Sequence, residues 1–299
     1  MPPNRLTPLA FATLLLIALM MGANHVAARL AFNSGLDIAT AVAARSLVTA
    51  AMVIVLVLSA SVPRQINRQQ ARGMLAAGVL VGLQSQCLYS AVARLPVALA
   101  LLAFNTYPLW TALWDRLIYK RVPERATLIA MPVILVGLAL ALDISGAASG
   151  LDAGAHWSQI GEGVLFALAA AAGFGLALVF VQHETTGVDG RVRSASTLLL
   201  AGLIAVAVVA AQGGPHWPQT ELGWWGLAAL TFLYGTAFTI MFTVLPRFGV
   251  AGNSAIMNVE PVFALVLAWA ALDQHIAPIQ VAGALLVVGA VMGLGLRKA

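Results

Sequence analysis

The sequence predicts an all-α integral membrane protein with ten transmembrane helices in a 5+5 inverted repeat. Three observations predict this fold: an apolar composition, ten runs long enough to cross a bilayer, and two halves that match at a fixed offset. Of the 299 residues, 61% are hydrophobic and only 9% are charged, and the mean hydropathy is +0.93. A soluble protein carries roughly a quarter charged residues, so this composition indicates that lipid is the solvent of the chain.

Each predicted span is a run of roughly 20 mainly apolar residues, the length that crosses the hydrocarbon core as a helix. The first run follows Arg5, as in a signal peptide, but it continues to about Ala28 and we expect it to be retained as a span. The connectors are too short to hold a soluble domain. The ten runs cover residues 8–28, 38–60, 72–93, 97–115, 126–142, 160–182, 195–212, 222–244, 250–271 and 277–296.

Lysine and arginine collect on one side of this arrangement. With the N-terminus inside, 13 of the 16 lie at cytoplasmic ends, and only Arg29, Arg45 and Arg94 do not. Because positive connectors stay inside, both termini are predicted to be cytoplasmic. The net charge of +5 comes from short clusters between apolar runs, a pattern typical of membrane flanks and not of nucleic-acid binding. The single cysteine, Cys87, excludes an intramolecular disulfide and a cysteine-cluster metal site.

An internal repeat is the most informative pattern in the sequence. Shifted by 153 residues, "YSAVARLPVA" lies over "FTVLPRFGVA" and "NTYP" lies over "NVEP". The shift corresponds to five spans, so equivalent helices run in opposite directions, as in many secondary transporters. We divide the chain into a first repeat of residues 1–149 and a second of 150–299. Coinciding pairs are Gly22 with Gly175, Gly82 with Gly235, Arg94 with Arg247, Asn105 with Asn258, and Pro108 with Pro261.

The segments "MGANHVAARLA" in the first span and "AFNTYPLWTAL" in the fourth add a family resemblance to these features. With its ten spans and its prolines in the fourth and ninth, the chain resembles the drug/metabolite transporter superfamily. Within that superfamily it is most similar to the ten-helix metabolite exporters of the bacterial aromatic amino-acid type. The resemblance implies helices around a central cavity, with the fifth and tenth spans outside, in a bacterial inner (plasma) membrane.

Glu260 stands directly before Pro261 within the apolar run "IMNVEPVF". A charged side chain at the centre of a span costs about 2.5–3.5 kcal/mol on insertion scales, so such residues usually face a bundle interior or a water-filled cavity. We expect Glu260 to border the cavity, where it meets a substrate ammonium or carries a coupled proton. The alternative is an acid that braces the backbone around Pro261. Its repeat counterpart is Tyr107, so the shared scaffold does not require the acid.

Pro108 and Pro261 each remove a backbone donor and are predicted to kink or unwind their helices, which could act as hinges. Asn105 and Asn258 lie three residues earlier on nearly the same helical face. They either satisfy the freed carbonyls or contact substrate directly.

Other polar and aromatic side chains inside the spans are candidates for substrate binding. His25 is a possible proton shuttle, but its spacing from Arg29 also fits a structural histidine near the outer boundary. The glutamines and Tyr89 line either the cavity or helix contacts, and the aromatic residues either stack on a guest or only pack. The candidates beside those already described are Asn24, His25, Gln84, Gln86, Tyr89, Tyr107, Trp110, Phe174, Tyr234 and Phe238.

Together these features favour a secondary transporter that exports small metabolites, most of all aromatic or neutral amino acids, and not an enzyme. A proton-coupled multidrug or amine exporter is the alternative, although the first span lacks the acid that the four-helix multidrug members carry there. A membrane-embedded transferase is a distant third, because Asp115 and Glu124 lack a neighbouring carboxylate cluster. The expected partners are a small-molecule substrate and the lipid bilayer, with no cofactor, metal or nucleic acid. Gly289 and Gly293 would permit either a dimer contact or an intramolecular one, so we expect a monomer or weak dimer.

Overall fold

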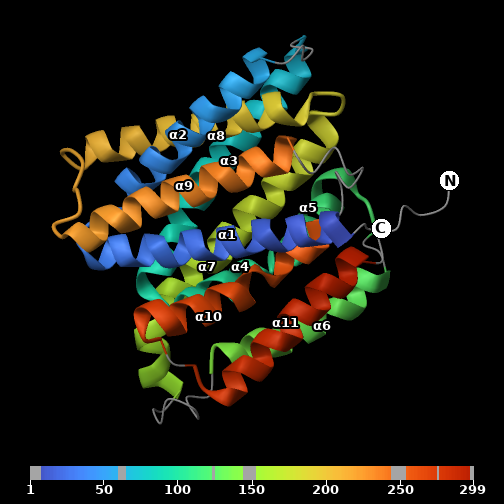
Figure 1. The fold of residues 1–299 in the computed structure, drawn as a ribbon. Coiled ribbons are helices and arrows are strands. Elements are labelled where there is room, and N and C mark those ends of the chain that lie inside the picture. Colours follow the sequence, from blue (N-terminus) through green and yellow to red (C-terminus); the bar gives the residue numbers. More distant parts are fainter. Residues whose placement is uncertain are drawn as a thin grey trace.

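The computed structural model describes residues 8–59, 65–122, 125–143, 153–243, 254–274 and 276–296, and all regular secondary structure within these ranges is helical. Each predicted span coincides with one helix or, for the fourth and ninth, with two consecutive helices (Figure 1). The helices are α1 (Pro8–Asn33), α2 (Ile38–Ser59), α3 (Arg68–Arg94), α4 (Val97–Phe104), α5 (Tyr107–Tyr119), α6 (Arg125–Ala141), α7 (Ala153–Glu184), α8 (Gly190–Ala211), α9 (Glu221–Thr243), η2 (Ser254–Val259), α10 (Glu260–Leu272) and α11 (Pro278–Leu296).

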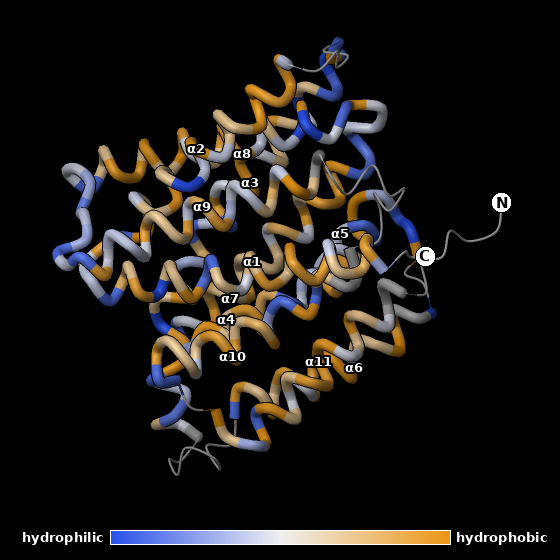
Figure 2. Tube along the Cα trace, in the orientation of Figure 1, coloured by the Kyte–Doolittle hydropathy of each residue, from blue (hydrophilic) through white to orange (hydrophobic). Residues whose placement is uncertain are grey.

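Long apolar helices are what lipid imposes on such runs, because a helix pairs its backbone N–H and C=O groups within one segment. Among the described residues, seven helical stretches are long and apolar enough to cross a membrane, including Val97–Tyr119, which α4 and α5 form together. The shorter apolar helices lie over Leu128–Ala141, Met257–Leu272 and Pro278–Gly293. Hydrophobic residues run along the helices and hydrophilic ones gather near their ends (Figure 2). The chain is therefore a multi-pass membrane protein.

The repeat found in the sequence has a structural counterpart. The offset of 153 carries α5 onto α10, and it also pairs α1 with α7, α2 with α8, α3 with α9 and α6 with α11. The residues that cap α5 and α10, Lys120 and Asp273, both adopt the left-handed backbone conformation, with φ of 55° and 53°. Equivalent helices also make equivalent contacts: α1 packs on α9 and α10, and its counterpart α7 packs on their counterparts α3 and α5. The predicted boundary at 149/150 and Arg247, the counterpart of Arg94, lie outside the described residues.

The fourth and ninth spans are both interrupted near their middle. Pro108 and Pro261 occupy the first turn of α5 and α10. Without a backbone N–H, neither can continue the hydrogen-bond ladder of a preceding helix. Ahead of Pro108, α4 ends at Phe104, and Thr106 bridges the gap by donating its hydroxyl to the Ala103 carbonyl at 2.8 Å. Ahead of Pro261, the chain forms the 3₁₀ helix η2.

Helices α6 and α11 pair at one edge of the molecule (Figure 1), in agreement with the outside position expected for the fifth and tenth spans. They approach closely because a Cβ on Gly283 would lie only 2.4 Å from the Ala141 nitrogen, and one on Gly137 only 2.9 Å from the Gly283 carbonyl oxygen. Gly289 and Gly293 differ: within the described ranges, no heavy atom lies within 4 Å of a Cβ built there. Within the part of the chain that the structure describes, the space beside these two glycines is therefore open.

Hydrogen bonds between helix ends or connectors join the elements at the two ends of the bundle. At one end, Gln69 of α3 donates to the Glu184 carboxylate of α7 at 2.9 Å. At the opposite end, the backbone N–H of His216 donates to the Asp37 carboxylate at 2.9 Å. These contacts join the connector after α1 to that after α8, and the start of α3 to the end of α7. The site described next lies between the two ends.

Candidate functional site

Glu260 is the first residue of α10 and lies directly against α1. Its Oε1 is 3.3 Å from Nε2 of His25, and the two side chains are 21% and 3% exposed, respectively. An acid inside a span is costly unless a partner or water stabilises it, and the imidazole is such a partner. The position at a helix N-terminus also favours a carboxylate. His25 is thus buried among the helices and contacts α10.

Two glycines bring the broken spans close to their supporting helices. A Cβ on Gly22 of α1 would lie 3.0 Å from the Glu260 carbonyl oxygen and 3.1 Å from the Ala264 nitrogen. A Cβ on Gly175 of α7 would lie 2.8 Å from the Thr111 nitrogen of α5. Ala264 and Thr111 are equivalent under the repeat, so the two contacts are the same contact made twice. Each broken span therefore rests, at its break, on the first helix of the opposite repeat.

Tyr89 of α3 links the two adjacent polar residues of α1. Its hydroxyl donates to Oδ1 of Asn24 at 3.1 Å, and its ring meets the His25 ring edge-on with centroids 5.7 Å apart. Asn24 and His25 point in different directions, as neighbours on a helix must, yet each reaches a different part of this tyrosine. Tyr89 is fully buried and is one of the largest side chains in the interior.

Arg45 of α2 completes this group, and the sequence did not identify it as a site residue. Its side chain is 3% exposed, and its guanidinium carbon lies 4.3 Å from the ring centroid of Tyr89 and 4.2 Å from that of Tyr234. Tyr234 in turn interacts electrostatically with both Arg45 and Glu260. The signal that could have revealed Arg45 was its position well inside the second span, where a cation is as costly as an acid.

A second group of side chains is aromatic and gathers at the other break. The Tyr107 hydroxyl donates to Oδ1 of Asn258 at 3.1 Å, which joins the two broken spans directly. The Phe174 ring lies 5.2 Å from that of Tyr107 and 5.4 Å from that of Phe104. Phe104 was not predicted as a site residue. Asn258 stands only two residues before Glu260, so the aromatic group adjoins the charged one.

The remaining predicted residues make other contacts. Gln84 faces α7 and is buried, which fits the helix-packing alternative. Trp110 stacks on Trp114 with centroids 6.4 Å apart. Phe238 stacks on Tyr234 at 4.7 Å and so supports the ring beneath Arg45.

Several buried polar atoms of these residues lack hydrogen-bond partners, although such atoms are normally paired. Among the described residues, three of them belong to the charged group itself: Asn24 Nδ2, His25 Nδ1 and Arg45 Nε. Gln86 Nε2 and Asn105 Nδ2 are two more. The group therefore keeps unused capacity to bind a polar guest. No cluster of three or more His, Cys, Asp or Glu that could hold a metal ion occurs within the described ranges.

Three cavities lie beside this group and not within it. A cavity of about 590 Å³ opens between Arg72 and Glu184 at one end of α3 and α7. One of about 440 Å³ lies on the apolar outer side of α2 and α9. A small apolar one of about 80 Å³ is lined by Pro261 and its neighbours on α4 and α11. The central cavity that the resemblance implies is not among these three.

An inverted repeat with two broken spans that meet inside the bundle is the architecture of many secondary transporters. The EamA-like transporter family matches residues 8–142 and 161–296, one match for each repeat, so the chain belongs to that family, within the drug/metabolite transporter superfamily. It is therefore a multi-pass membrane transporter of small molecules.

A solved crystal structure of another protein, 19% identical in sequence, aligns with a TM-score of 0.61 over 97% of this chain and 98% of that chain. At this identity the similarity shows the shared fold alone. No curated protein sequence matches the chain. The closer likeness to aromatic amino-acid exporters stays a prediction.

Proposed function

We propose that the chain is a secondary transporter that exports small metabolites, chiefly aromatic and neutral amino acids, by alternating access of its two repeats. The observation that carries the proposal is the Glu260–His25 pair, which adjoins the aromatic group of Tyr107 and Phe174 where both spans are broken. In inverted-repeat transporters the substrate binds near the midplane at broken helices. A carboxylate suits a substrate ammonium, and aromatic rings suit an aromatic side chain.

The interlocked packing supports a rocking mechanism. Because α10 rests on α1 through Gly22 and α5 rests on α7 through Gly175, a movement of one repeat carries a broken span of the other. The breaks before Pro108 and Pro261 are the natural hinges, since they lack continuous helical hydrogen bonds. The sequence has no phosphate-binding loop of the P-loop type, so we expect a gradient to drive transport.

We place the protein in the bacterial inner membrane with both termini in the cytoplasm. In support, Arg68 and Arg72 at the start of α3 lie at the same end as Glu184, the last residue of α7. Basic residues at one end are typical of the cytoplasmic side. The expected partners are a small-molecule substrate and lipid, with the chain acting as a monomer or weak dimer and without a cofactor.

The same pair favours a second function, proton-coupled export of amines or drugs. His25 and Glu260 are two groups able to bind a proton, 3.3 Å apart inside the bundle, and a carrier coupled to protons needs such a group within its spans. A carrier of this kind would exchange a cytoplasmic cation for protons. Facilitated export and proton-coupled export therefore differ in their response to a pH gradient.

Efflux from proteoliposomes tests the proposal. Vesicles loaded with labelled phenylalanine, tryptophan, threonine or an amine drug are compared with and without a pH gradient, for the natural chain and for Glu260→Gln. We expect saturable efflux of the aromatic amino acids, lowered at least about tenfold by Glu260→Gln because the substrate ammonium loses its charged partner. Glu162→Gln is the control, since Glu162 is 68% exposed and pairs with Arg94 at 2.9 Å, away from the group.

The outcomes separate the two functions. If the efflux rate does not depend on the pH gradient and Glu260→Gln only lowers that rate, the chain is a facilitator and Glu260 binds substrate. If the gradient drives efflux of the amine drug and Glu260→Gln abolishes that component, proton-coupled export is the function. If correctly inserted natural protein moves no amino acid in the panel, the proposed substrate class is wrong.

A further inference from the structure

We propose that Arg45 binds the carboxylate of a zwitterionic substrate whose ammonium faces Glu260. This inference rests on the proposed function and deepens it, because it selects amino acids over simple amines as the transported class. It assigns a binding role to Arg45, which stood out in the sequence only as one of three basic residues that do not lie at a cytoplasmic end.

The first step is that Arg45 is a buried cation without a counter-ion. Its side chain is 3% exposed, and a guanidinium stays protonated under all ordinary conditions. In the part of the chain that the structure describes, every ion pair joins other residues, so no carboxylate lies within ion-pair distance of Arg45. A charge in the membrane interior marks a substrate or ion pathway by default.

The second step is that the neighbours of Arg45 position it without using all of its hydrogen-bonding capacity. The rings of Tyr89 and Tyr234, at 4.3 Å and 4.2 Å, hold the guanidinium by cation–π attraction. That attraction stabilises the positive charge but provides no hydrogen-bond acceptor for Nε, which remains buried without a partner. A planar fork of N–H donors is what binds a carboxylate through two parallel hydrogen bonds.

The third step is that a series of contacts connects Arg45 to an acid. The Tyr89 ring that contacts the guanidinium also meets the His25 ring edge-on, and His25 Nε2 lies 3.3 Å from Glu260 Oε1, so the positive and negative groups belong to one cluster. An amino acid carries its ammonium and carboxylate on a single carbon and can pair with both. An amine without a carboxylate leaves the buried guanidinium unpaired. A site binds a ligand much more weakly when the ligand lacks the group that pairs with a buried polar residue.

The fourth step comes from the repeat. The counterpart of Arg45 is Leu198 and the counterpart of Glu260 is Tyr107, so each charge occurs in only one repeat. Residues that serve the shared scaffold recur in both, as the glycines and prolines do. The two charges are therefore additions to the scaffold, and their opposite signs match a zwitterion.

The test is the ratio of phenylalanine efflux to phenylethylamine efflux, because the two compounds differ only in the carboxylate. In the natural chain we expect phenylalanine to be favoured at least about tenfold. In Arg45→Gln the ratio should fall towards one through loss of phenylalanine efflux, while phenylethylamine efflux changes less than about twofold. Arg45→Lys, which keeps the charge but not the planar fork, should lie between them.

Arg29→Gln is the matched control, since Arg29 is a half-buried arginine of α1 that donates to the Val92 carbonyl at 2.7 Å. It should leave the ratio unchanged. If Arg45→Gln also leaves the ratio unchanged, or if the natural chain does not favour phenylalanine, the assignment of Arg45 falls while amino-acid export stands. If the natural chain moves neither compound, the proposed function falls and this inference with it.

Should Arg45→Gln fail to fold, competition on the natural chain decides. Phenylalaninamide, whose carboxylate is blocked, must then inhibit phenylalanine efflux at least about tenfold more weakly than unlabelled phenylalanine does. Equal inhibition overturns the assignment.

Discussion

The charged residues Glu260 and Arg45 both lie well inside spans, and they are stabilised in different ways. The acid has the His25 imidazole at 3.3 Å and keeps some exposure. The guanidinium of the arginine lies over two tyrosine rings, and its Nε has no hydrogen-bond partner among the described residues. The difference matters because a buried ion with a partner can be purely structural, whereas one without a partner has stabilisation still to gain from a ligand.

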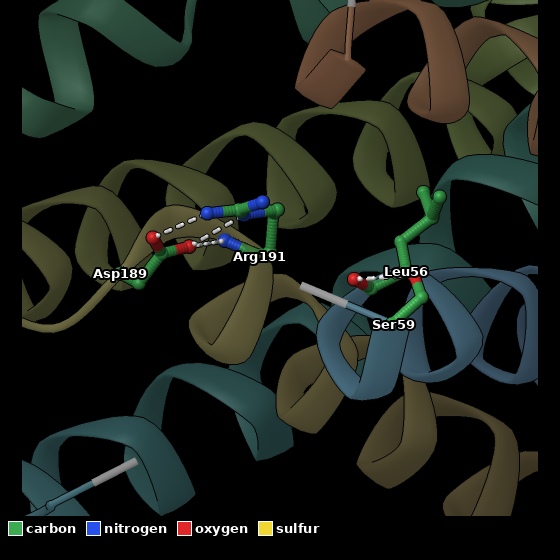
Figure 3. A network of polar contacts seen from close by, with 4 residues as sticks. All are labelled: Leu56, Ser59, Asp189 and Arg191. Atoms are coloured by element: carbon green, nitrogen blue, oxygen red, sulfur yellow. Dashed lines mark hydrogen bonds and ion pairs between the residues drawn. The ribbon is translucent and has the colours of Figure 1, made fainter. Parts of the chain in front are cut away.

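A third charged residue, Asp189, lies outside the spans and caps α8. Figure 3 shows its carboxylate facing Arg191, whose backbone N–H donates to Oδ1 at 2.8 Å and whose guanidinium lies 3.1 Å from Oδ2. The side-chain hydrogen bond from Arg191 lowers the pKa of Asp189 below its ordinary value. A lowered carboxyl pKa stabilises the fold above the ordinary value of about 4 and ceases to do so as the pH falls through the lowered value.

We therefore predict that Asp189→Asn lowers the free energy of unfolding at pH 7 by less than about 1 kcal/mol, because the pair is partly exposed and asparagine still caps the helix. Asp189→Ala also loses the cap and should cost about 1 kcal/mol more. Thermal unfolding in detergent measures the stability change of both variants. The difference between the natural chain and Asp189→Asn should shrink below a pH of about 4, and a difference that grows there would contradict the assignment.

The residue scale also shows what sequence could predict of the site. Glu260 stood out because an acid is rare in an apolar run, and Pro108 and Pro261 because they recur at one offset. Arg45 carried the same signal but was counted only for its side of the membrane. Phe104 carried none, since one phenylalanine in an apolar run looks like any other until folding places it beside Phe174.

At the scale of elements, the two broken spans are the features that the chain reproduces most closely. Their second halves, α5 and α10, begin and end at equivalent residues, and both begin with a proline in the first turn. The interruption was predictable from proline chemistry. The partner of each span was not, because periodicity identifies an apolar face but not the helix that covers it. Only the structure shows that Gly22 and Gly175 support α10 and α5.

This support predicts that Gly175→Ala displaces α5. A Cβ would lie 2.8 Å from the Thr111 nitrogen, so backbone must shift at an overpacking cost of about 1–3 kcal/mol. The better helix propensity of alanine offsets about 1 kcal/mol of it. Gly173→Ala in the same helix is the matched control, since its Cβ would make only ordinary contacts, with Gln84 Cβ at 3.7 Å and the Leu80 carbonyl oxygen at 3.9 Å. The unfolding temperature and the rate of phenylalanine efflux should both fall for Gly175→Ala and stay unchanged for Gly173→Ala. Equal behaviour of the two variants would show that the close approach is not required.

At the scale of the whole molecule, the fold was predictable from the sequence because lipid leaves few alternatives. A run of about 20 apolar residues forms a helix there, and an offset of five spans inverts the second half. The predicted runs accordingly coincide with helices from α1 to α11. The interior was less predictable, because the pattern of an apolar run does not show which of its side chains meet those of another helix.

Orientation is the whole-molecule property that charge predicts most directly. Arg68 and Arg191, at the starts of α3 and α8, belong to one end of the bundle, whereas the connector after α8 has no lysine or arginine. Because positive connectors remain on the cytoplasmic side, Gln65 should be inside and Gln212 outside. Both glutamines are exposed, and Cys87 is the single cysteine, so a Cys87→Ser background gives a matched pair of probes, Gln65→Cys and Gln212→Cys.

In right-side-out spheroplasts, a membrane-impermeant maleimide should label Gln212→Cys at once and Gln65→Cys only after the membrane is permeabilised. The opposite pattern would place the basic end outside and would turn an exporter into an importer for any directional mechanism. Labelling of both probes before permeabilisation would indicate mixed insertion, which is the state of chains with balanced connector charge. With 13 of 16 basic residues at the predicted inner ends, that balance is absent here, so a single orientation is the expected result.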